Sequence, residues 1–484
     1  MQEKAKEIAD KLKGSEKVHI VSHIDADGLS SAGIAYKALK RSGVDVDFEF
    51  IKQLESEKLK EIKSEDHELI WFTDLGSGQL KGLSGVNCVI TDHHEPQGQL
   101  HQNKVGEVSL KDRGNLLNYS NSNLNPEPDI LELNPHRYGI DGASELCGAG
   151  TTYLVARELG ENADLSKLAV VGAVGDLQAS KEGRLIGKNR EILEEGVSEG
   201  HVDSRLDARF YGLESRPLFK VLQYASDPVL PGLTGDEESC INFLINLDIP
   251  MKNGDEWRRW YHLSKSEKRK ILSSLGKRLL KRGYPYHYVD NLIGEVYTFP
   301  DEEIGTMLHE AKEFSTLLNS CGRYNKGDVG LQVCLGDRGE YLKKAEQLLK
   351  GHQKVLVECM NYVESAGGVK ERDLIQYFHG KDEIPDTVLG TVAGMILGSG
   401  DVDRELVMIA FANSSEREGL KVSSRGTKRL VDRGLDLSEI MSIVSDEFGG
   451  EGGGHDIAAG AYIPQGVEED FLDRVEKMIK KQLD

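Results

Sequence analysis

The sequence has few of the residues that mark zinc-binding, secreted or membrane proteins. Only 6 of its 484 residues are cysteine, and no two form a Cys-x-x-Cys pair, which argues against a zinc site. Their scattered positions, several within apolar runs, are typical of reduced thiols in a cytoplasm. No apolar run approaches the roughly 20 residues of a membrane-spanning helix, and the charged N-terminal segment has no apolar signal region. We therefore expect a cytoplasmic protein without a membrane partner.

Positive charge is also in short supply. The chain has 81 acidic and 60 basic residues, a net charge of -21. This balance argues against indiscriminate coating of nucleic acid, but local clusters of lysine and arginine can still bind phosphates. The chain is longer than the size at which a single hydrophobic core keeps growing, so we expect two or three domains.

From residue 17 to about 190, short apolar runs alternate with helical stretches, a pattern that predicts βα units and a parallel sheet. We expect strands over residues 18–22, 44–51, 69–73, 86–91 and 168–175. A glycine-rich turn at Gly148 predicts a helix that ends near Leu159; its free N–H groups could hold a phosphate, although a plain glycine-rich turn is the commoner explanation. The polar stretch 115–128 is predicted to be a long surface loop.

Residues from about 200 to 300 combine aromatic residues with helix-forming charges. Trp257, Trp260 and Tyr261 lie beside arginines and are residue types that dominate interfaces, although each could equally fill a local core. A helix is expected after Ser264, with Glu267 completing a capping box. Its basic residues could form a solvated face, a docking surface or the rim of a nucleic-acid site; they are Lys265, Lys268, Arg269, Lys270, Lys277, Arg278, Lys281 and Arg282.

A new αβ pattern begins near residue 344, with strands expected over 355–359 and 406–411. Alternation in a further strand would place Lys421, Ser423 and Arg425 on one face. The glycine-rich segment 448–460, which contains His455, could present backbone N–H groups to an anion. The alternative is an exposed polar strand followed by a structural turn.

Residues that can bind metals follow the expected strands. His23, Asp25 and Asp27 would share one face of an extended segment, and the other candidates are Asp74, the triplet Asp92-His93-His94, and Asp176. Each alone could be an ordinary loop residue or helix cap, but together they lie where parallel sheets gather reactive groups. Carboxylates with imidazoles favour Mn²⁺ or Mg²⁺. They are too many for one ion, so we expect two ions bridged by a shared carboxylate, an arrangement that hydrolyses phosphate esters.

These motifs, in this order, resemble those of the DHH phosphoesterase superfamily, which includes RecJ nucleases, oligoribonucleases and cyclic dinucleotide phosphodiesterases. The segment from Asn319 to Arg323 is similar to the Asn-x-x-Gly-Arg element of RecJ-like nucleases, and residues 448–460 resemble the glycine-rich signature of the DHHA1 domain, with Glu451 where the family often has a small residue. The segment 133–142, with His136, adds a likeness to the archaeal RecJ-like group that contains the GINS-associated nuclease.

The resemblance implies an α/β fold in which a parallel-sheet DHH catalytic domain, a helical insertion and a smaller α/β DHHA1 domain flank an active-site cleft. We predict a DHH domain over 1–195, a mainly helical insertion over 196–300, a connector over 301–343 and a nucleic-acid-binding DHHA1 domain over 344–484. The resemblance also implies a partnership between the insertion and the GINS complex, with MCM helicase nearby, in archaeal DNA replication or repair.

The expected metal ligands, with Asp74 as the bridge between the two ions, are His23, Asp25, Asp27, Asp74, His93 and Asp176. The expected catalytic residues are His23, Asp74, His94 and Arg323. The expected substrate contacts are His94, His136, Asn319, Arg323, Ser423, Arg425, Gly453, Gly454 and His455, although His136 could be an ordinary loop residue.

The resulting hypothesis is a two-metal exonuclease, dependent on Mn²⁺ or Mg²⁺, that releases nucleotides from an end of single-stranded DNA or RNA. One alternative is a phosphodiesterase of very short oligonucleotides or cyclic dinucleotides. An alternative of another class is a replisome scaffold that binds GINS or MCM. Retention of every expected ligand favours catalysis over scaffolding alone.

Overall fold

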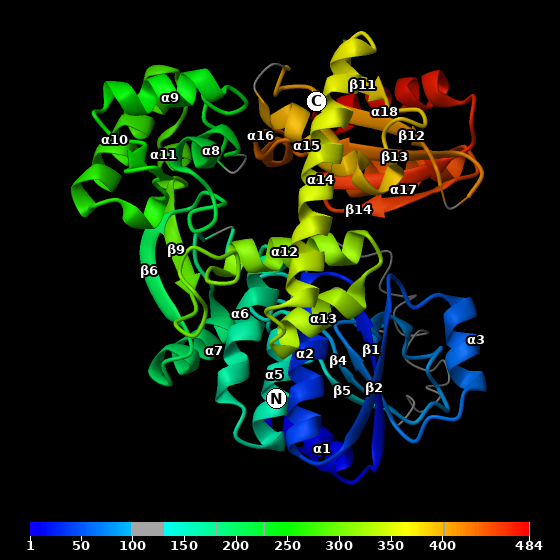
Figure 1. Ribbon diagram of the computed structural model, residues 1–484. Helices are drawn as coiled ribbons and strands as arrows, with labels where there is room; N and C mark the ends of the chain where they lie inside the picture. Colours follow the sequence, from blue (N-terminus) through cyan, green and yellow to red (C-terminus); the bar gives the residue numbers. More distant parts are fainter. Residues whose placement is uncertain (98–129, 181, 226–227, 400–401, 416, 484) are drawn as a thin grey trace, which may run out of the picture. The chain divides into compact units, whose positions relative to one another are not determined.

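The computed structural model of the chain describes residues 1–97, 130–180, 182–225, 228–399, 402–415 and 417–483 (Figure 1). These residues form two compact units. The first unit comprises residues 1–216, 259–262 and 290–348, and the second comprises 217–258, 263–289 and 349–484. The surface loop expected over residues 115–128 lies outside the described residues.

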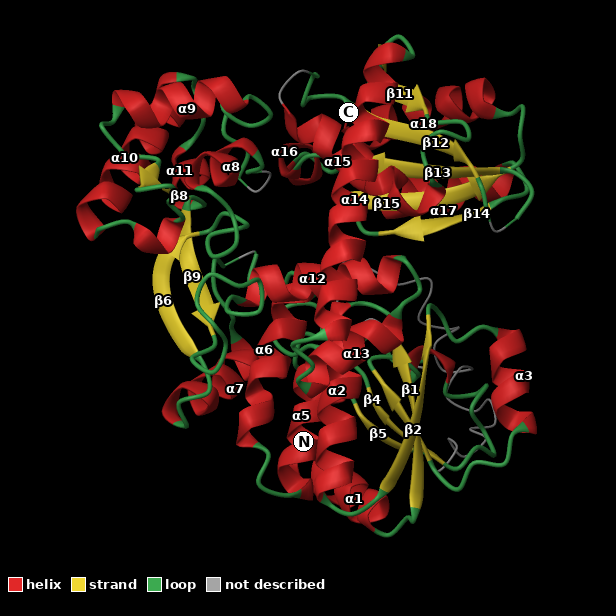
Figure 2. Ribbon diagram, viewed as in Figure 1, coloured by secondary structure: helices red, strands yellow, loops and turns green. Residues whose placement is uncertain are grey.

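The first unit is built on a five-stranded parallel sheet, which confirms the predicted sheet type (Figure 2). Its strands lie in the order β2-β1-β3-β4-β5. They are β1 (Lys17–His23), β2 (Asp45–Ile51), β3 (Ile70–Thr73), β4 (Cys88–Thr91) and β5 (Leu131–Leu133). All side chains of β3 and β4 are buried, as expected for strands covered on both faces.

Helices cover this sheet on both faces. On one face, α3 (Ser56–Ser64) packs its Ile62 against Ile70, Phe72 and Ile90. The remaining helices form a layer in which α2, α5 and α6 contact one another and α1 contacts α5. These helices are α1 (Gln2–Lys13), α2 (Ala26–Arg41), α5 (Gly148–Leu159) and α6 (Ser166–Gly175). The predicted helix from Gly148 to Leu159 is therefore confirmed.

The apolar run 168–175, expected to be a strand, forms most of helix α6 instead. Periodicity cannot separate a buried strand from a buried helix when every residue is apolar. The small residues Ala169, Gly172 and Ala173 allow α6 to pack closely against its neighbours α2, α5 and α12 (Ala311–Arg323). Burial on all sides explains why this helix shows no polar face.

The first unit is completed by a long two-stranded antiparallel ribbon and three helices. The ribbon pairs β6 (Asp203–Ala208) with β9 (Ile293–Thr298). The helices are α7 (Gly187–Ser198), α13 (Gly327–Leu335) and the first residues of α14 (Glu340–Ser365), which continues into the second unit.

The insertion is mainly helical, as predicted, with a short hairpin of β7 (Lys252–Asn253) and β8 (Glu256–Trp257). Its helices are α8 (Leu218–Gln223), α9 (Glu237–Asn246), α10 (Lys265–Lys281) and α11 (Tyr286–Asp290). The predicted capping box of Ser264 and Glu267 begins α10. Trp260 is buried and donates to Asp207 at 2.7 Å, so it fills a core, whereas Trp257 remains 42% exposed.

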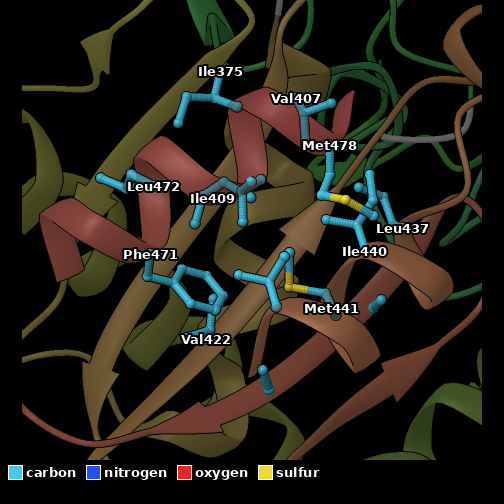
Figure 3. Close-up of a cluster of buried hydrophobic side chains, with 14 of the residues drawn as sticks. Ile375, Val407, Ile409, Val422, Leu437, Ile440, Met441, Phe471, Leu472 and Met478 are labelled. Atoms are coloured by element: carbon cyan, nitrogen blue, oxygen red, sulfur yellow. The ribbon is translucent and has the colours of Figure 1, made fainter. Parts of the chain in front are cut away.

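The second unit contains a six-stranded sheet in the order β10-β11-β12-β13-β15-β14. Its strands are β10 (Lys370–Glu371), β11 (Ile375–His379), β12 (Val407–Asn413), β13 (Leu420–Arg425), β14 (Glu451–Gly454) and β15 (Ala458–Ile463). Helices α17 (Leu437–Glu447) and α18 (Glu468–Leu483) bury Met441 and Phe471 against Ile409 and Val422 on one face (Figure 3). On the other, α14 and α15 (Asp386–Ser399) pack against Met408 and Ala410.

The strand expected over 355–359 is wrong, because these residues belong to the 26-residue helix α14. Within α14, Cys359 and Val363 lie four residues apart and both pack into the core beside α15, which is helical spacing. A short helix, α16 (Lys428–Asp432), follows β13. Among the described helices, none combines the length and apolar character that crossing a membrane requires.

Candidate metal centre

The turn between β1 and α2 carries three of the predicted ligands. β1 ends at His23, and Asp25 caps α2 by accepting a hydrogen bond from the Gly28 amide at 2.9 Å. Asp27 lies in the first helical turn. The expected extended segment with alternating ligands is therefore wrong; the ligands converge because the chain turns from strand into helix. Gly28 permits this turn, since a Cβ there would lie 2.0 Å from the His23 carbonyl oxygen.

Asp74 follows β3 and adopts a left-handed backbone conformation with φ of 60°. This conformation is uncommon for residues other than glycine, although aspartate and asparagine tolerate it best. The side chain is buried, and Gly148 makes room for it, because a Cβ at Gly148 would lie 2.3 Å from Asp74 Oδ1. Strain of this kind clusters at functional sites.

Asp27, rather than a phosphate, occupies the N-terminus of α5. Its carboxylate accepts hydrogen bonds from the amides of Gly148 at 2.7 Å and Ala149 at 2.9 Å, the first residues of α5. The positive end of the helix dipole stabilises this buried negative charge. The two amides therefore hold a side chain of the site itself.

The candidate ligands gather around Asp74 and His93. His93 Nε2 lies 3.2 Å from Asp74 Oδ1 and 3.7 Å from Asp27 Oδ2, and His93 Nδ1 lies 3.9 Å from Asp176 Oδ2. Within the described part of the chain, three sets of possible ligand atoms are close enough to share an ion. The sets are His23 with Asp25 and Asp74, Asp74 with His93 and His94, and Asp27 with His93 and Asp176.

A second layer of polar residues fixes the orientation of His93. His93 Nδ1 lies 2.7 Å from the Gly142 carbonyl oxygen, and because a carbonyl only accepts, Nδ1 carries the proton. Nε2 is then the nitrogen available to a metal ion, the arrangement found in most metal-binding histidines. Gln178 donates to the same carbonyl at 2.7 Å and to Asp176 Oδ2 at 2.9 Å, and Asn189 donates to Gln178.

Asp92 organises the loop after β4. Its Oδ1 accepts from the amides of His93 and His94, and its Oδ2 accepts from the amide of Ser77. His94 Nδ1 lies 2.8 Å from Asp92 Oδ1, while the His94 side chain is 56% exposed. Asp92 therefore shapes the loop, and His94 is accessible to a substrate at the edge of the site.

Asp176 ends α6 as its C-cap, so the prediction that it follows a strand is wrong. The side chain still reaches the cluster, at the distance from His93 given above. It is held by Gln178 and is 33% exposed. Asp176 therefore reaches the cluster from the C-terminus of a helix, and not from the end of a strand as the sequence predicted.

The electrostatics of the cluster favour a bound cation. Burial and the negative charge of Asp74 raise the pKa of Asp27 well above its usual value. Burial lowers the pKa of the His23 imidazole, but its contacts with Asp25 and Asp74 more than offset this and raise the pKa to about 11. The cluster contains more carboxylates than positively charged groups, and bound divalent ions would reduce the repulsion between these carboxylates.

Two buried atoms also lack ordinary partners. Asp74 Oδ1 and His23 Nδ1 make no hydrogen bond with proper geometry, although His23 Nδ1 lies 3.0 Å from Asp25 Oδ2. Buried polar atoms without hydrogen bonds are costly unless another ligand satisfies them. Oxygen and imidazole donors in overlapping sets therefore fit divalent metal ions such as Mn²⁺ or Mg²⁺.

The other predicted residues of the first unit lie around the ligand turn. Asn319 Oδ1 accepts from the Ala26 amide at 3.0 Å, between Asp25 and Asp27. Gly322 permits this approach, because a Cβ there would lie 1.8 Å from the Ile24 carbonyl oxygen. Arg323 ends α12 and is exposed. His136 lies near His93, since a Cβ at Gly142 would meet both His136 Nε2 and the His93 carbonyl oxygen.

The remaining predicted contacts belong to the second unit. Ser423 and Arg425 lie on β13, and Ser423 pairs across the sheet with Gly460, which pairs with Gly453. The glycine-rich segment forms the edge strand β14, and Gly454 leads to the exposed His455, whose amide donates to the Ala458 carbonyl. The segment expected to form an anion site is thus a β-hairpin with small residues.

Sequence reasoning missed the residues that support the ligands. Gln178 and Asn189 are uncharged and follow no periodic pattern, so nothing in the sequence marked them. Gly142, Gly148 and Gly172 have no signal beyond their glycine-rich surroundings, yet a Cβ at each would lie within about 2.3 Å of a ligand side chain or the His93 backbone. Only the folded arrangement shows why these positions require glycine.

Comparison with protein families matches three segments of the chain. Residues 17–168 match the N-terminal domain of the DHH family, residues 210–293 the DHH-CID domain, and residues 370–481 the DHHA1 domain. Over the whole chain, an uncharacterised protein of Methanocaldococcus jannaschii is 31% identical, with full coverage of both. The chain belongs to the DHH family, whose members are metal-dependent phosphoesterases, and its insertion and C-terminal domain are of the DHH-CID and DHHA1 types.

More distant relatives show the same fold. The single-stranded-DNA-specific exonuclease RecJ of Bacillus subtilis is 27% identical over 201 residues, 37% of this chain and 22% of that protein. RecJ of Thermus thermophilus bound to Mn²⁺ superposes with a TM-score of 0.58 at 17% identity, over 99% of this chain but only 55% of that one. CDC45 of Entamoeba histolytica superposes with a TM-score of 0.63 at 12% identity, over 99% of both chains. The chain thus spans about half of the Thermus protein.

Proposed function

We propose that the protein is a two-metal phosphodiesterase that releases nucleotides from an end of a single-stranded nucleic acid. The observation that carries this proposal is the position of Asp74 in two of the three overlapping ligand sets. His23 and Asp25 would hold one ion, Asp27, His93 and Asp176 would hold the other, and Asp74 would bridge them. Such ions lower the pKa of a bound water and stabilise charge on phosphoryl oxygens.

The chain's own groups complete the chemistry. The amides of Gly148 and Ala149 orient Asp27, while Gln178 and Gly142 hold Asp176 and His93 in orientation. The exposed His94, whose Nδ1 is engaged by Asp92, offers Nε2 to a phosphate oxygen. Arg323 would neutralise a non-bridging phosphate oxygen through its planar guanidinium.

The second unit would hold the strand. Ser423, Arg425 and His455 would contact phosphates, and Gly453 and Gly454 would let the strand approach the backbone closely. Arg425→Ala should then weaken strand binding and flatten its dependence on salt by about 0.7 units of log-log slope, the value for one phosphate contact with single strands. Unchanged affinity and slope would contradict this assignment.

Digestion of DNA and RNA strands labelled at the 5′ or the 3′ end tests the activity. With Mn²⁺ or Mg²⁺ we expect progressive shortening from one end, with loss of activity in EDTA and recovery on addition of Mn²⁺. A dinucleotide and a cyclic dinucleotide, assayed in parallel, test the alternative of a small-substrate phosphodiesterase. Hydrolysis of these two with long strands left intact would contradict the exonuclease proposal.

A scaffold role is the second candidate, and it can coexist with catalysis. It is supported by the likeness to CDC45 in fold and by basic residues of α10 that are exposed on an acidic protein, among them Arg269 and Lys277. By family resemblance, the partner that we propose is the GINS complex, with MCM helicase nearby.

A further inference from the structure

The DHHA1 sheet carries a cavity that the proposed catalytic chemistry does not use. It has a volume of about 900 Å³ and lies at the end of β13 where Leu420 begins the strand. Arg417, Glu451 and Tyr462 line it, together with polar residues such as Asn413 and Gln465. The cavity is built entirely from residues of the second unit.

Register places this cavity on the same sheet face as the predicted phosphate contacts. Lys421 of β13 pairs with Tyr462 of β15, which pairs with Glu451 of β14. This row lies two residues, or about 7 Å, along the strands from the row of Ser423, Gly460 and Gly453. Since side chains two residues apart on a strand share a face, the two rows form one continuous surface.

This surface is open over β14 and β15, whereas α15 packs on β13 and leaves Ser423 only 6% exposed. A Cβ built at Gly453 would have nothing within 4 Å, whereas one at the neighbouring Gly452 would lie 2.4 Å from the Met441 carbonyl oxygen of α17. Gly452 therefore faces α17, and Gly453 faces the opposite side, which is open at this edge of the sheet. A strand can therefore lie over Gly453 and Gly460 and reach Tyr462.

Tyr462 supports a guanidinium at stacking distance. Arg417 Cζ lies 3.8 Å from the centroid of the Tyr462 ring, and Arg417 Nη1 donates to Glu451 Oε2 at 3.0 Å. Glu451 thus contacts Arg417 where the guanidinium lies over the ring, and Arg417 remains 47% exposed. Lys421 Nζ lies 3.9 Å from the same centroid, and its side chain passes over Gly460, which has no side chain to block it.

The charges of the cavity select a base over a phosphate. Among its described lining residues, Arg417 is opposed by Glu418 and Glu451, so the lining is not positive overall. A phosphate would be repelled there, whereas the uncharged face of a nucleobase stacks well on a guanidinium or an aromatic ring. Lys421 is not part of the lining. It lies on β13 between the cavity and the row that contains Gly460 and Gly453, where it could contact the phosphate next to the bound base.

We propose that Arg417, stacked on Tyr462 and positioned by Glu451, is a platform for one nucleobase of a bound single strand. This inference rests on the proposed function, which it deepens by assigning a base-binding subsite beyond the phosphate contacts. It also gives Glu451 a role, at a position where a small residue is more usual in the family. Glu451 acts as a positioning residue because it touches Arg417 and not the base.

The test combines single abasic sites in the strand with variants of the protein. Binding is measured with a labelled DNA strand in the Asp74→Asn background, which prevents its hydrolysis. We expect one strand position at which removal of the base weakens binding about tenfold, or about 1.4 kcal/mol. In Arg417→Ala the intact strand should bind about tenfold more weakly, and the abasic site should cause no further loss.

Four further variants test the role of each group. Arg417→Lys keeps the charge but not the plane, so it should behave like Arg417→Ala. Arg433→Ala removes an arginine of the second unit that is 49% exposed, about as much as Arg417, and is paired with Glu405; it should change binding by less than about twofold, the surface ion pair being weak. Glu451→Gly should release Arg417 and weaken the response to the abasic site, while Tyr462→Phe, which keeps the ring, should preserve it.

The platform would be overturned if, at every strand position, the loss of affinity from the abasic site added fully to the loss from Arg417→Ala. It would also be overturned if Arg417→Lys bound the strand as tightly as the wild-type protein. Thermal unfolding checks that each variant is folded. Failure of the proposed function is a separate result, in which the unsubstituted protein neither hydrolyses nor binds any strand. Strand shortening by wild type, with unchanged binding in Arg417→Ala, rejects the platform alone.

Discussion

Asp74 is the single residue on which the candidate site depends most. It is buried, it is shared by two ligand sets, and its backbone is left-handed. Asp74→Asn keeps the side-chain shape and tolerates this backbone, but it removes the negative charge. We expect hydrolysis to fall by about a thousandfold or more, because several kcal/mol of transition-state stabilisation depend on the ions.

The matched measurement is thermal unfolding with and without Mn²⁺. The wild-type protein should gain stability with Mn²⁺, because a ligand that binds only the folded state stabilises it. Asp74→Asn should gain much less. A variant with normal hydrolysis and a normal Mn²⁺-induced shift would reject Asp74 as a ligand.

At the residue scale, the sequence indicated the candidate ligands that the structure brings together, but not the residues that support them. His23, Asp74 and His93 stood out as members of a set, because several such groups near the ends of apolar runs point to one site although each alone could be a loop residue or helix cap. Gln178 and Asn189 act only through the atoms that they hold, and those atoms come from segments far apart in the chain. No local pattern encodes such a contact.

At the element scale, helix α6 shows why a wholly apolar run is ambiguous. Its Gly172 lets Asp27 lie against the helix, since a Cβ there would be 2.3 Å from Asp27 Oδ1 and 2.5 Å from the Cβ of Ala149. Gly172→Ala should destabilise the fold by about 1–3 kcal/mol through overpacking and weaken Mn²⁺ binding. Denaturant unfolding and calorimetric titration with Mn²⁺ measure the two effects.

Gly351→Ala is the control for that substitution. Gly351 lies in helix α14, is exposed, and has open space around a built Cβ. Because alanine favours a helix by about 1 kcal/mol over glycine, this variant should be slightly more stable and bind Mn²⁺ normally. Equal effects of the two substitutions would mean that Gly172 is not a contact of the site.

Helix α12, which carries Asn319 and Arg323, begins with two buried carboxyls. Burial and the negative charge of Glu313 raise the pKa of Glu310 to about 8, and burial and the negative charge of Glu214 raise the pKa of Glu313 to about 7. Both groups bind protons more tightly when folded than when unfolded. Their contribution to stability is therefore complete below about pH 4.5 and is lost as the pH rises toward 8.

Glu313→Gln tests this dependence. The amide keeps an oxygen for the amides of Glu214 and Ser215 but never ionises. Relative to wild type, the variant should become more stable as the pH rises from 5 to 8, by on the order of 3 kcal/mol for a shift of this size. Urea unfolding across this range measures it, and parallel pH profiles for both proteins would contradict the assigned pKa.

At the scale of the whole molecule, the family order of domains was predictable because the DHH and DHHA1 motifs lie in sequence order. The sequence did not show which of the insertion's arginines and aromatic residues form internal contacts and which remain accessible. Arg258 forms a double hydrogen bond with Glu267, and Arg259 donates to the carbonyls of Glu214 and Gly305. These arginines, like Trp260, hold the fold together, so only part of the expected docking residues remain accessible.

A partnership of the insertion therefore has to be tested at exposed positions. Arg269→Glu with Lys277→Glu reverses two charges on α10 without touching the internal pairs. We expect this variant to lose binding to purified GINS complex at least tenfold, because like charges across an interface cost several kcal/mol, while strand hydrolysis stays normal. Pull-down and end-labelled digestion measure the two properties on the same protein. Full GINS binding by the variant would exclude α10, and absence of binding by the intact chain would exclude GINS as the partner.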